Sequence, residues 1–238
     1  MQQFVLLFLT VVSLLEIAYA EYTLVTTISA SIPTVGDNFG SGFSLVMNGT
    51  TIIVAVPLPV AASVPTVISP HVEIFISENF GQTWSYTQSI TCCPTLPSFQ
   101  YNPFAIAFSD NAASMIIGSV NDYPNPVVVS LYTFSNGMYL NSSIDLGCGN
   151  AIFAGTGKSV AISGDGVYTF VTYRNVTDFL FYISYTNFLT EACQCIQAAY
   201  DGFADITLTT NFDGSTLIVS ENKNVYIYIY TAFLSNKF

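Results

Sequence analysis

Charged side chains, and basic ones above all, are scarce in this sequence. Its 238 residues include 4 Lys and Arg against 15 Asp and Glu, which gives a formal net charge of −11. Proteins that bind nucleic acids neutralise phosphates with Lys and Arg, so we expect neither nucleic acid nor an anionic membrane as a partner. Only 8% of the residues are charged, against roughly 25% in an ordinary soluble domain. An unusual share of this chain is therefore expected to be buried.

Residue types that recur in active sites are equally few. The chain has one histidine, His71, and one arginine, Arg174, whereas a sialidase-type enzyme holds the carboxylate of its substrate with several arginines. His71 lies in no Gly-x-Ser-x-Gly or Cys-His setting that would activate a nucleophile. Nothing in the sequence singles out the facing carboxylates of a glycosidase. We therefore predict that the chain is not an enzyme, and keep a glycan-active hydrolase as a minor alternative.

Long apolar runs are confined to the first twenty residues. The run from Phe4 to Leu15 is followed by Glu16 and by Ala18-Tyr19-Ala20, a small-x-small pattern typical of signal peptidase sites. A membrane anchor is the alternative, but the run is shorter than the ~20 residues that a spanning helix needs. We expect residues 1–20 to be a cleaved signal peptide and the mature chain to be secreted or displayed on a cell or particle surface, without membrane insertion.

Three sequons and five cysteines fit an exported chain. The sequons begin at Asn48, Asn141 and Asn175, which are the predicted glycosylation sites. The cysteines are disulfide candidates because export favours oxidation, and their odd number leaves at least one thiol outside an intrachain bridge. They are Cys92, Cys93, Cys148, Cys193 and Cys195.

Aromatic and β-branched residues are abundant instead, and they fall into a repeat. Four segments, which start at Phe43, Phe104, Lys158 and Ala204, each read as strand, turn, strand, with turns roughly 50–60 residues apart. The turn pairs favour positive φ, so each is predicted to form a two-residue hairpin. These pairs are Asn48-Gly49, Asp110-Asn111, Asp165-Gly166 and Asp213-Gly214.

Further strands complete the repeats. Third strands are predicted over 72–77, 127–133, 179–185 and 225–230, and fourth strands over 84–91 and 139–146. In the third repeat the fourth strand is expected in LTEACQCIQAA, where Thr190 and Glu191 would alternatively start a short helix. Several strands are apolar on both faces, as in sheets that lie between two others. The pattern predicts an all-β fold, a β-propeller of about four four-stranded blades.

The last repeat ends after its third strand, which suggests how a ring would close. The segment 22–29 (YTLVTTIS) is similar to the predicted fourth strands and has no partner of its own. We expect it to pair with the last blade, because this would remove two exposed sheet edges. The mature chain is thus predicted to be a single domain over 21–238, with blades at approximately 39–93, 100–148, 155–197 and 203–238 plus 21–30.

Two motifs resemble those of known propeller families. Residues 37–57 (DNFGSGFSLVMNGTTIIVAVP) resemble the FG-GAP repeat of integrin α-type propellers, and 155–166 (GTGKSVAISGDG) resembles it again. Residues 77–84 (SENFGQTW) resemble the Asp-box of sialidase-like propellers, with Asn79 in place of the Asp. In that family the motif shapes the hairpin between the third and fourth strands. Both resemblances imply a propeller fold and neither implies an activity.

Calcium is the cofactor that the FG-GAP resemblance raises, since integrin-type repeats bind it through Asp-rich turns. No run in this chain has that density of carboxylates. Oxygen ligands for calcium would have to come from Asp37, Asn38, Asp201 and Asp205. Turn and hairpin roles are the more common use of such residues, so no cofactor is assigned.

Function is expected to lie in loops that a rigid scaffold positions. The favoured hypothesis is a secreted adhesion or binding module for an extracellular protein or glycan. The predicted loop 57–70 is apolar with four prolines, and is either a packed connection or an exposed adhesive loop. The alternative is a structural component of a larger extracellular or particle-surface assembly, with partnered half-rings in place of a closed monomer.

The cysteines provide the first testable prediction. Non-reducing peptide mapping of the secreted chain should recover disulfide-linked peptides, because the cysteines recur near the ends of the fourth strands, where bridges would brace connections between blades. Recovery of all five thiols in the free form would contradict this prediction.

Overall fold

The computed structural model describes eleven segments of the chain. They are residues 27–29, 43–58, 71–91, 102–120, 129–142, 153–154, 159–175, 181–187, 192–197, 206–221 and 224–229. The predicted signal peptide, the predicted loop 57–70 beyond Leu58, and most of the predicted strand 22–29 lie outside these residues.

The described residues form four antiparallel sheets and no helix. The first sheet contains β1 (Ser44–Asn48), β2 (Thr51–Leu58), β3 (His71–Ser77) and β4 (Ser85–Ile90). The second contains β5 (Asn102–Phe108), β6 (Ser114–Val120), β7 (Val129–Ser135) and β8 (Met138–Asn141). The third contains β10 (Val160–Ile162), β11 (Tyr168–Asn175), β12 (Phe181–Asn187) and β13 (Ala192–Gln197), with β9 (Phe153–Ala154) paired to β11. The fourth contains β14 (Ile206–Thr210), β15 (Thr216–Glu221) and β16 (Asn224–Ile229).

In every sheet the neighbours in space are also neighbours in sequence, apart from β9. This meander order confirms the all-β class and the predicted repeat of strands. The segment with Cys193 and Cys195 is a fourth strand, β13, where the alternative was a helix. The fourth strand of the second sheet is shorter than predicted and covers only Met138–Asn141.

One local prediction was wrong in three of the four repeats. Of the four predicted turns, only the one after β1 has two residues, Gly49 and Thr50, with Gly49 at a φ of 62°. The loops after β5, β10 and β14 have five residues each, at 109–113, 163–167 and 211–215. The predicted pairs lie inside these longer loops, where side chains hydrogen-bond the backbone, so the turn-forming residues were identified correctly but the turn length was not.

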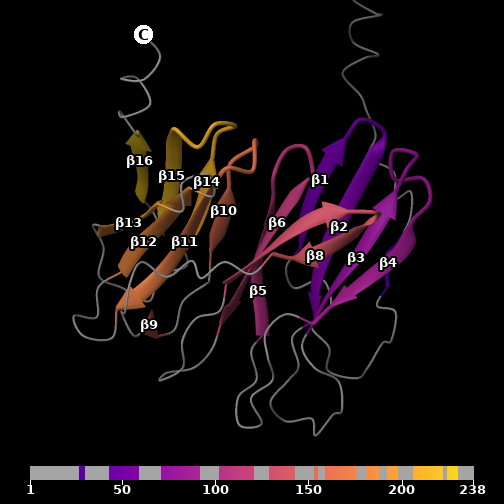
Figure 1. The fold of residues 1–238 in the computed structure, drawn as a ribbon, viewed down its shortest axis with the longest axis horizontal. Coiled ribbons are helices and arrows are strands. Elements are labelled where there is room, and N and C mark those ends of the chain that lie inside the picture. The colour runs from indigo at the N-terminus through magenta and orange to yellow at the C-terminus, as the bar shows by residue number, and fades with distance from the viewer. Residues whose placement is uncertain are drawn as a thin grey trace, which may run out of the picture.

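The four sheets follow one another around a common centre. Strands β1, β5, β10 and β14 lie toward the middle in Figure 1, and consecutive ones contact each other: β1 with β5, β5 with β10, and β10 with β14. We call the side of a sheet that faces the next sheet along the chain its forward face, and the opposite side its backward face. Inward first strands and stacked faces are the arrangement expected of propeller blades.

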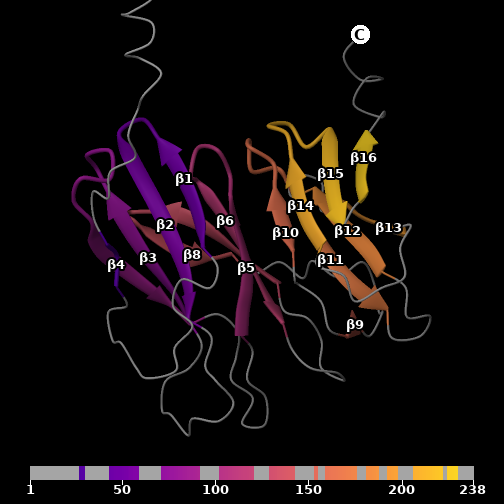
Figure 2. The same ribbon diagram turned by 180° about the vertical axis from the view of Figure 1, so that it is seen from behind.

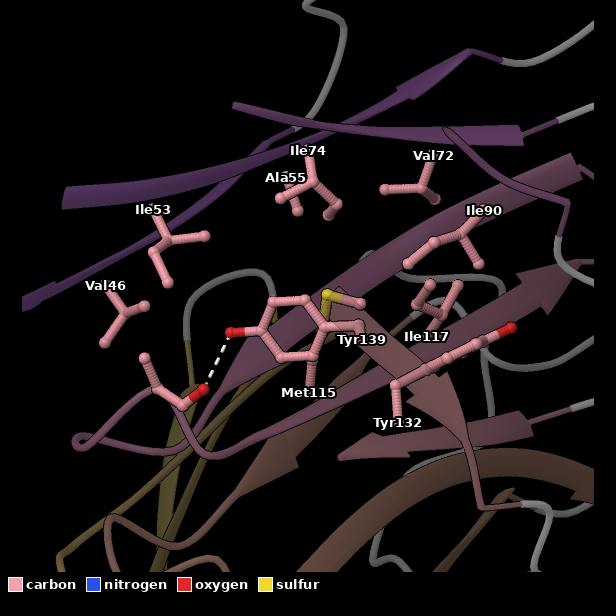
Figure 3. Packing of buried hydrophobic residues seen from close by; sticks show 11 residues of the cluster. Val46, Ile53, Ala55, Val72, Ile74, Ile90, Met115, Ile117, Tyr132 and Tyr139 are labelled. Atoms are coloured by element: carbon pink, nitrogen blue, oxygen red, sulfur yellow. Dashed lines mark hydrogen bonds between the residues drawn. The ribbon is translucent and has the colours of Figure 1, made fainter. Parts of the chain in front are cut away.

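The contact between the first two sheets forms the largest described core (Figure 3). The forward face of the first sheet contributes Val46, Ile53, Ala55, Val72, Ile74 and Ile90, and the backward face of the second contributes Met115, Ile117, Tyr132 and Tyr139. The Tyr139 hydroxyl donates a hydrogen bond of 2.7 Å to the carbonyl oxygen of Ala112, the dashed line in Figure 3. Burial raises the pKa of this phenol above its ordinary value, so Tyr139 stays a neutral donor.

The other contacts between neighbouring sheets also pair the forward face of one sheet with the backward face of the next. Ile116 and Leu131 on the forward face of the second sheet pack against Val160, Ile162 and Val171 of the third. The forward face of the third sheet then packs against the fourth in a cluster of Ala161, Tyr168, Phe170, Ile183, Tyr185, Leu208, Leu217 and Val219. Each inner sheet buries apolar side chains on both faces, which accounts for the low charge of the chain.

Hydrogen bonds also join the sheets at specific points. The Gln88 side chain in β4 accepts from the backbone amide of Tyr139 and donates to its carbonyl oxygen, both at 2.8 Å. Between the third and fourth sheets, the Leu208 amide donates to the buried Ser159 hydroxyl at 2.8 Å. Polar groups buried in such contacts must be paired, so these bonds fix the relative positions of neighbouring sheets.

Packing at the loop tips provides a prediction about stability. Gly214 has a φ of 70°, and a Cβ atom there would lie 2.7 Å from Tyr168 Cδ2 in the preceding sheet. Gly49 has a φ of 62° but nothing within 4 Å of such an atom. Gly49→Ala should therefore lower the free energy of unfolding by about 1–2 kcal/mol through backbone strain alone. Gly214→Ala should lower it by roughly 2–5 kcal/mol, because strain and the displaced tyrosine ring add.

Urea or thermal unfolding of the two variants measures this difference. Equal losses of stability would contradict the close contact between Gly214 and Tyr168.

Candidate functional site

Short, well-defined loops gather at one end of the molecule, which we call the hairpin end. It carries the turns between the first and second strands of the four sheets and the loop between β3 and β4, and it lies at the top of Figure 1. The Phe80 amide donates to the Thr50 carbonyl oxygen at 3.0 Å, so the two loops of the first sheet touch here. Loops held in this way form a rigid surface.

The three five-residue loops share one hydrogen-bond pattern. A side-chain oxygen at the first position, from Ser109, Ser163 or Asn211, accepts from the amide of the residue that starts the next strand, at 2.9–3.0 Å. An Asp or Asn at the third position accepts from the amide two residues later, at 2.9–3.0 Å. The fourth residue adopts a positive φ in all three loops, and it is Ala112, Gly166 and Gly214 in turn.

Backbone hydrogen bonds link these loops from sheet to sheet. The Asp110 amide donates to the Gly164 carbonyl oxygen at 3.0 Å, and the Asp165 amide donates to that of Phe212 at 2.9 Å. At the first sheet, the Asn48 side chain donates to the Asn111 carbonyl oxygen at 3.2 Å. The hairpin end is therefore a continuous rim across all four sheets.

Gly164 is the point where three sheets meet on this rim. A Cβ atom there would overlap the carboxylate of Asp110 from the second sheet and lie 2.6 Å from Phe212 Cδ2 of the fourth. Both neighbours are solvent-exposed, and Phe212 is 61% exposed. A carboxylate that accepts hydrogen bonds thus stands beside an open aromatic ring. We define Asp110, Gly164 and Phe212 as the rim site.

The carboxylates of the rim differ in their surroundings. Asp165 accepts a 2.5 Å hydrogen bond from the Ser163 hydroxyl and another from the Val167 amide, so it is committed to its own loop. Hydrogen bonds from the Ser215 side chain and backbone lower the pKa of Asp213 below its ordinary value. Asp110 remains as the exposed carboxylate next to an aromatic side chain.

The segment 77–84 forms the loop between β3 and β4, as predicted. The Asn79 side chain accepts a hydrogen bond from the Thr83 amide and donates one to the Thr83 hydroxyl, both at 2.9 Å. The Gly81 amide donates to the Ser77 hydroxyl at 2.8 Å. Trp84 packs beneath against Val54, Val56 and Phe75. These residues shape a hairpin, so their role is structural.

The single histidine lies at the opposite end of the first sheet. His71 Nε2 is 3.7 Å from Glu73 Oε1, and the Glu73 side chain is fully buried. Both residues belong to β3, two positions apart, and therefore lie on the same face of the strand. This pair was not predicted from the sequence, where His71 was only noted to lie in no setting that would activate a nucleophile.

Most of the site residues predicted from sequence lie in parts of the chain that the structure does not describe. Asp37, Asn38, Asp201, Asp205, Cys92, Cys93 and Cys148 lie outside the described residues. Cys193 and Cys195 lie on β13 opposite Thr186 and Ser184. Of the predicted glycosylation sites, Asn48 and Asn141 are exposed at strand ends, and Asn175 is the last residue of β11.

Two further searches concern metals and membranes. Within the described segments, no three His, Cys, Asp or Glu side chains gather as metal ligands would. The same part of the chain contains no helix with the length and hydrophobicity needed to cross a bilayer.

Neither a protein-family model nor a curated protein matches the sequence. Similar solved structures include an ancestral GH74 enzyme, with 18% identity, 77% of this chain and 25% of that one covered, and a TM-score of 0.47. Trypanosoma rangeli sialidase has 10% identity, 79% and 35% coverage and a TM-score of 0.49. The Dos1 propeller has 13% identity, 78% and 43% coverage and a TM-score of 0.48. The chain thus spans less than half of each of these proteins.

These comparisons correct one prediction. The chain was predicted not to be an enzyme, with a glycan-active hydrolase as a minor alternative, but a GH74 enzyme and a sialidase are among the similar structures. The prediction that the chain is not an enzyme is withdrawn. No family match supports the finer resemblance to FG-GAP repeats or to the Asp-box.

The hydrogen bonds of the fourth-sheet loop generate a prediction about pH. In Ser215→Ala the pKa of Asp213 should rise toward its ordinary value, because the largest cause of its lowering is removed. A lowered pKa stabilises the fold above the ordinary carboxyl range, and this contribution is lost as the pH falls through the lowered pKa. The variant should therefore lose less stability on acidification than the parent. NMR titration of the Asp213 carboxyl carbon measures the shift.

Ser85→Ala, at an exposed serine of β4, is the matched control and should leave the pKa of Asp213 unchanged. An unchanged pKa in Ser215→Ala as well would contradict the assigned hydrogen bond.

Proposed function

We propose that this chain is a secreted or surface-exposed binding module of β-propeller type, which holds a glycan or protein partner at its hairpin end. The observation that carries the proposal is the rim site, where the Asp110 carboxylate and the Phe212 ring both lie against Gly164. Loops on a rigid scaffold are the usual place for binding residues.

A glycan is the partner that this chemistry fits best. Sugars present hydroxyl donors beside apolar C–H faces, and the site offers a carboxylate acceptor beside an aromatic face. Gly164 lets both groups approach its backbone closely, since any side chain there would displace one of them. The net charge of −11 argues against phosphorylated or nucleic acid partners.

The finer predictions about the fold remain part of this proposal. They are a single domain over 21–238 after a signal peptide, about four blades, and a last blade completed by the strand 22–29. Of that strand, residues 27–29 are described, and Ile28 packs on the backward face of the first sheet. Secretion and glycosylation at Asn48, Asn141 and Asn175 likewise stay proposals.

A structural role in a larger assembly is the second candidate. It is favoured by the apolar side chains that remain exposed on the first and last sheets. The two functions are compatible, since the exposed faces and the rim site lie on different surfaces.

Glycan-array binding by the mature chain tests the proposed site. Phe212→Ala and Asp110→Asn should each weaken binding at least about tenfold, equivalent to ~1.4 kcal/mol, because one removes the aromatic face and the other the charged acceptor. Phe80→Ala is the matched control, since Phe80 is similarly exposed, at 63%, on the hairpin of the first sheet. It should bind as the parent does.

Undiminished binding by both rim-site variants would contradict the placement of the site. Binding of a protein partner with no response on the array would contradict the glycan.

A further inference from the structure

The charged side chains that the structure describes at the hairpin end are all acidic. Three belong to the loops after β5, β10 and β14, and one belongs to the loop between β3 and β4. They are Asp110, Asp165, Asp213 and Glu78. The basic residues in the described part of the chain, His71 and Arg174, lie near the opposite ends of their strands. The acidic end therefore attracts cationic ligands and repels anionic ones.

The Asp110 carboxylate is available to a ligand. Asp165 and Asp213 accept hydrogen bonds from amides of their own loops. Within the described residues the exposed Asp110 carboxylate has no hydrogen-bond or ion-pair partner of this kind. A ligand can therefore bind it without breaking a hydrogen bond inside the protein. Ion pairs with a hydrogen bond are the stronger class of polar contact, so an ammonium group is a favourable partner.

The Phe212 ring offers a second contact to the same ligand. A Cβ atom on Gly164 would lie 2.7 Å from Asp110 Cγ and 2.6 Å from Phe212 Cδ2, so the two groups meet at one point of the rim. Phe212 is 61% exposed, which leaves its ring open to a ligand. An aromatic face attracts cations and packs against C–H groups. A ligand with an ammonium beside C–H groups therefore fits both side chains.

We propose that the rim site selects sugars with a free amino group, hexosamine units that carry an ammonium, and that the Asp110 carboxylate reads this charge. The inference rests on the proposed function, because it names the class of glycan that the rim site holds. The amino group is attached directly to the sugar ring, so one unit supplies both the ion pair to Asp110 and the C–H face for Phe212. Neutral sugars lack the ion pair, and the acidic rim repels sugars with carboxylate or sulfate groups.

The rim continues beyond this site, which favours a chain of such units. Figure 2 shows the loops after β5, β10 and β14 side by side at the upper end of the molecule, and backbone hydrogen bonds join them. Stacked sheets lie ~10 Å apart, a spacing that a short oligosaccharide spans. Hydrogen bonds that lower the pKa of Asp213 also keep this carboxyl ionised at neutral pH. A glycan with repeated ammonium groups thus meets a carboxylate on each of three sheets.

A lysine-rich peptide is the other polycation that an acidic surface attracts. A lysine carries its ammonium at the end of a flexible stem, and ordering that stem costs rotamer entropy. A sugar amine is fixed on a rigid ring, so a hexosamine binds with a smaller loss of freedom.

Calorimetric titration with two hexasaccharides tests the proposal. One is a β-1,4-linked glucosamine oligomer and the other is its fully N-acetylated form, so the two share length and linkage but differ in charge. The mature chain should bind the free-amine form at least about tenfold more tightly. A lysine hexapeptide of equal charge is the third ligand and should bind more weakly than the free-amine sugar.

Three variants assign the preference to the rim site. Asp110→Asn keeps the shape of the side chain but removes its charge, so the affinities for the two hexasaccharides should become nearly equal. Phe212→Ala should weaken binding of both forms. Glu78→Gln is the matched control, because Glu78 is an exposed carboxylate on another loop of the hairpin end, and it should retain the preference of the parent. Circular dichroism checks that each variant is folded.

Equal affinity of the parent for the two hexasaccharides, with both weakened in Phe212→Ala, would overturn the amino-sugar inference and leave the proposed function standing. So would binding of neither hexasaccharide by a chain that binds other glycans at the rim site. A preference that Asp110→Asn and Glu78→Gln reduce equally would show that the net charge of the chain, and not Asp110, selects the amine. Binding of the lysine peptide without binding of any glycan would contradict both the inference and the proposed glycan.

Discussion

Every sheet in the described part of this molecule is apolar on both faces, and each face therefore needs another sheet. Burying apolar side chains is the dominant favourable term in folding. A sheet that is polar on one face can leave that face exposed to solvent, but a sheet that is apolar on both faces is more stable when both are covered. The described sheets stack one behind another, and apolar side chains stay exposed on β1 at one end and on β16 at the other. The low charge of the sequence follows from this requirement.

The hairpin loops serve the same stacking. In each five-residue loop, a Ser or Asn oxygen and an Asp or Asn oxygen bond the backbone of their own loop. This leaves other backbone amides and carbonyls free to reach the neighbouring loop, as between Asp110 and Gly164. The small fourth residue then fits against the preceding sheet. Each loop is thus held by hydrogen bonds within itself and by hydrogen bonds to the neighbouring loop, and together the loops form a rigid rim.

Much of this architecture can be predicted from sequence, because strands and their order depend on local pattern. The runs around Ile53, Ile116 and Ile218 are β-branched and bounded by turn residues, which is enough to identify paired strands. Turn length could not be predicted in this way. Asp165-Gly166 has the composition of a two-residue hairpin. The Ser163 hydroxyl, however, donates to the Asp165 carboxylate and accepts from the Tyr168 amide, and these two hydrogen bonds stabilise a loop of five residues. Repeating Ser or Asn, then Asp or Asn two residues on, was the available signal.

The rim site was beyond prediction for a different reason. Asp110 and Phe212 are about a hundred residues apart, and only the stacking of three sheets brings both of them against Gly164. No motif encodes such a neighbourhood. The same stacking explains why one apolar face stays exposed. Val225, Ile227 and Ile229 of β16 remain open because none of the described sheets packs against them. An exposed apolar face of this kind is a site for association.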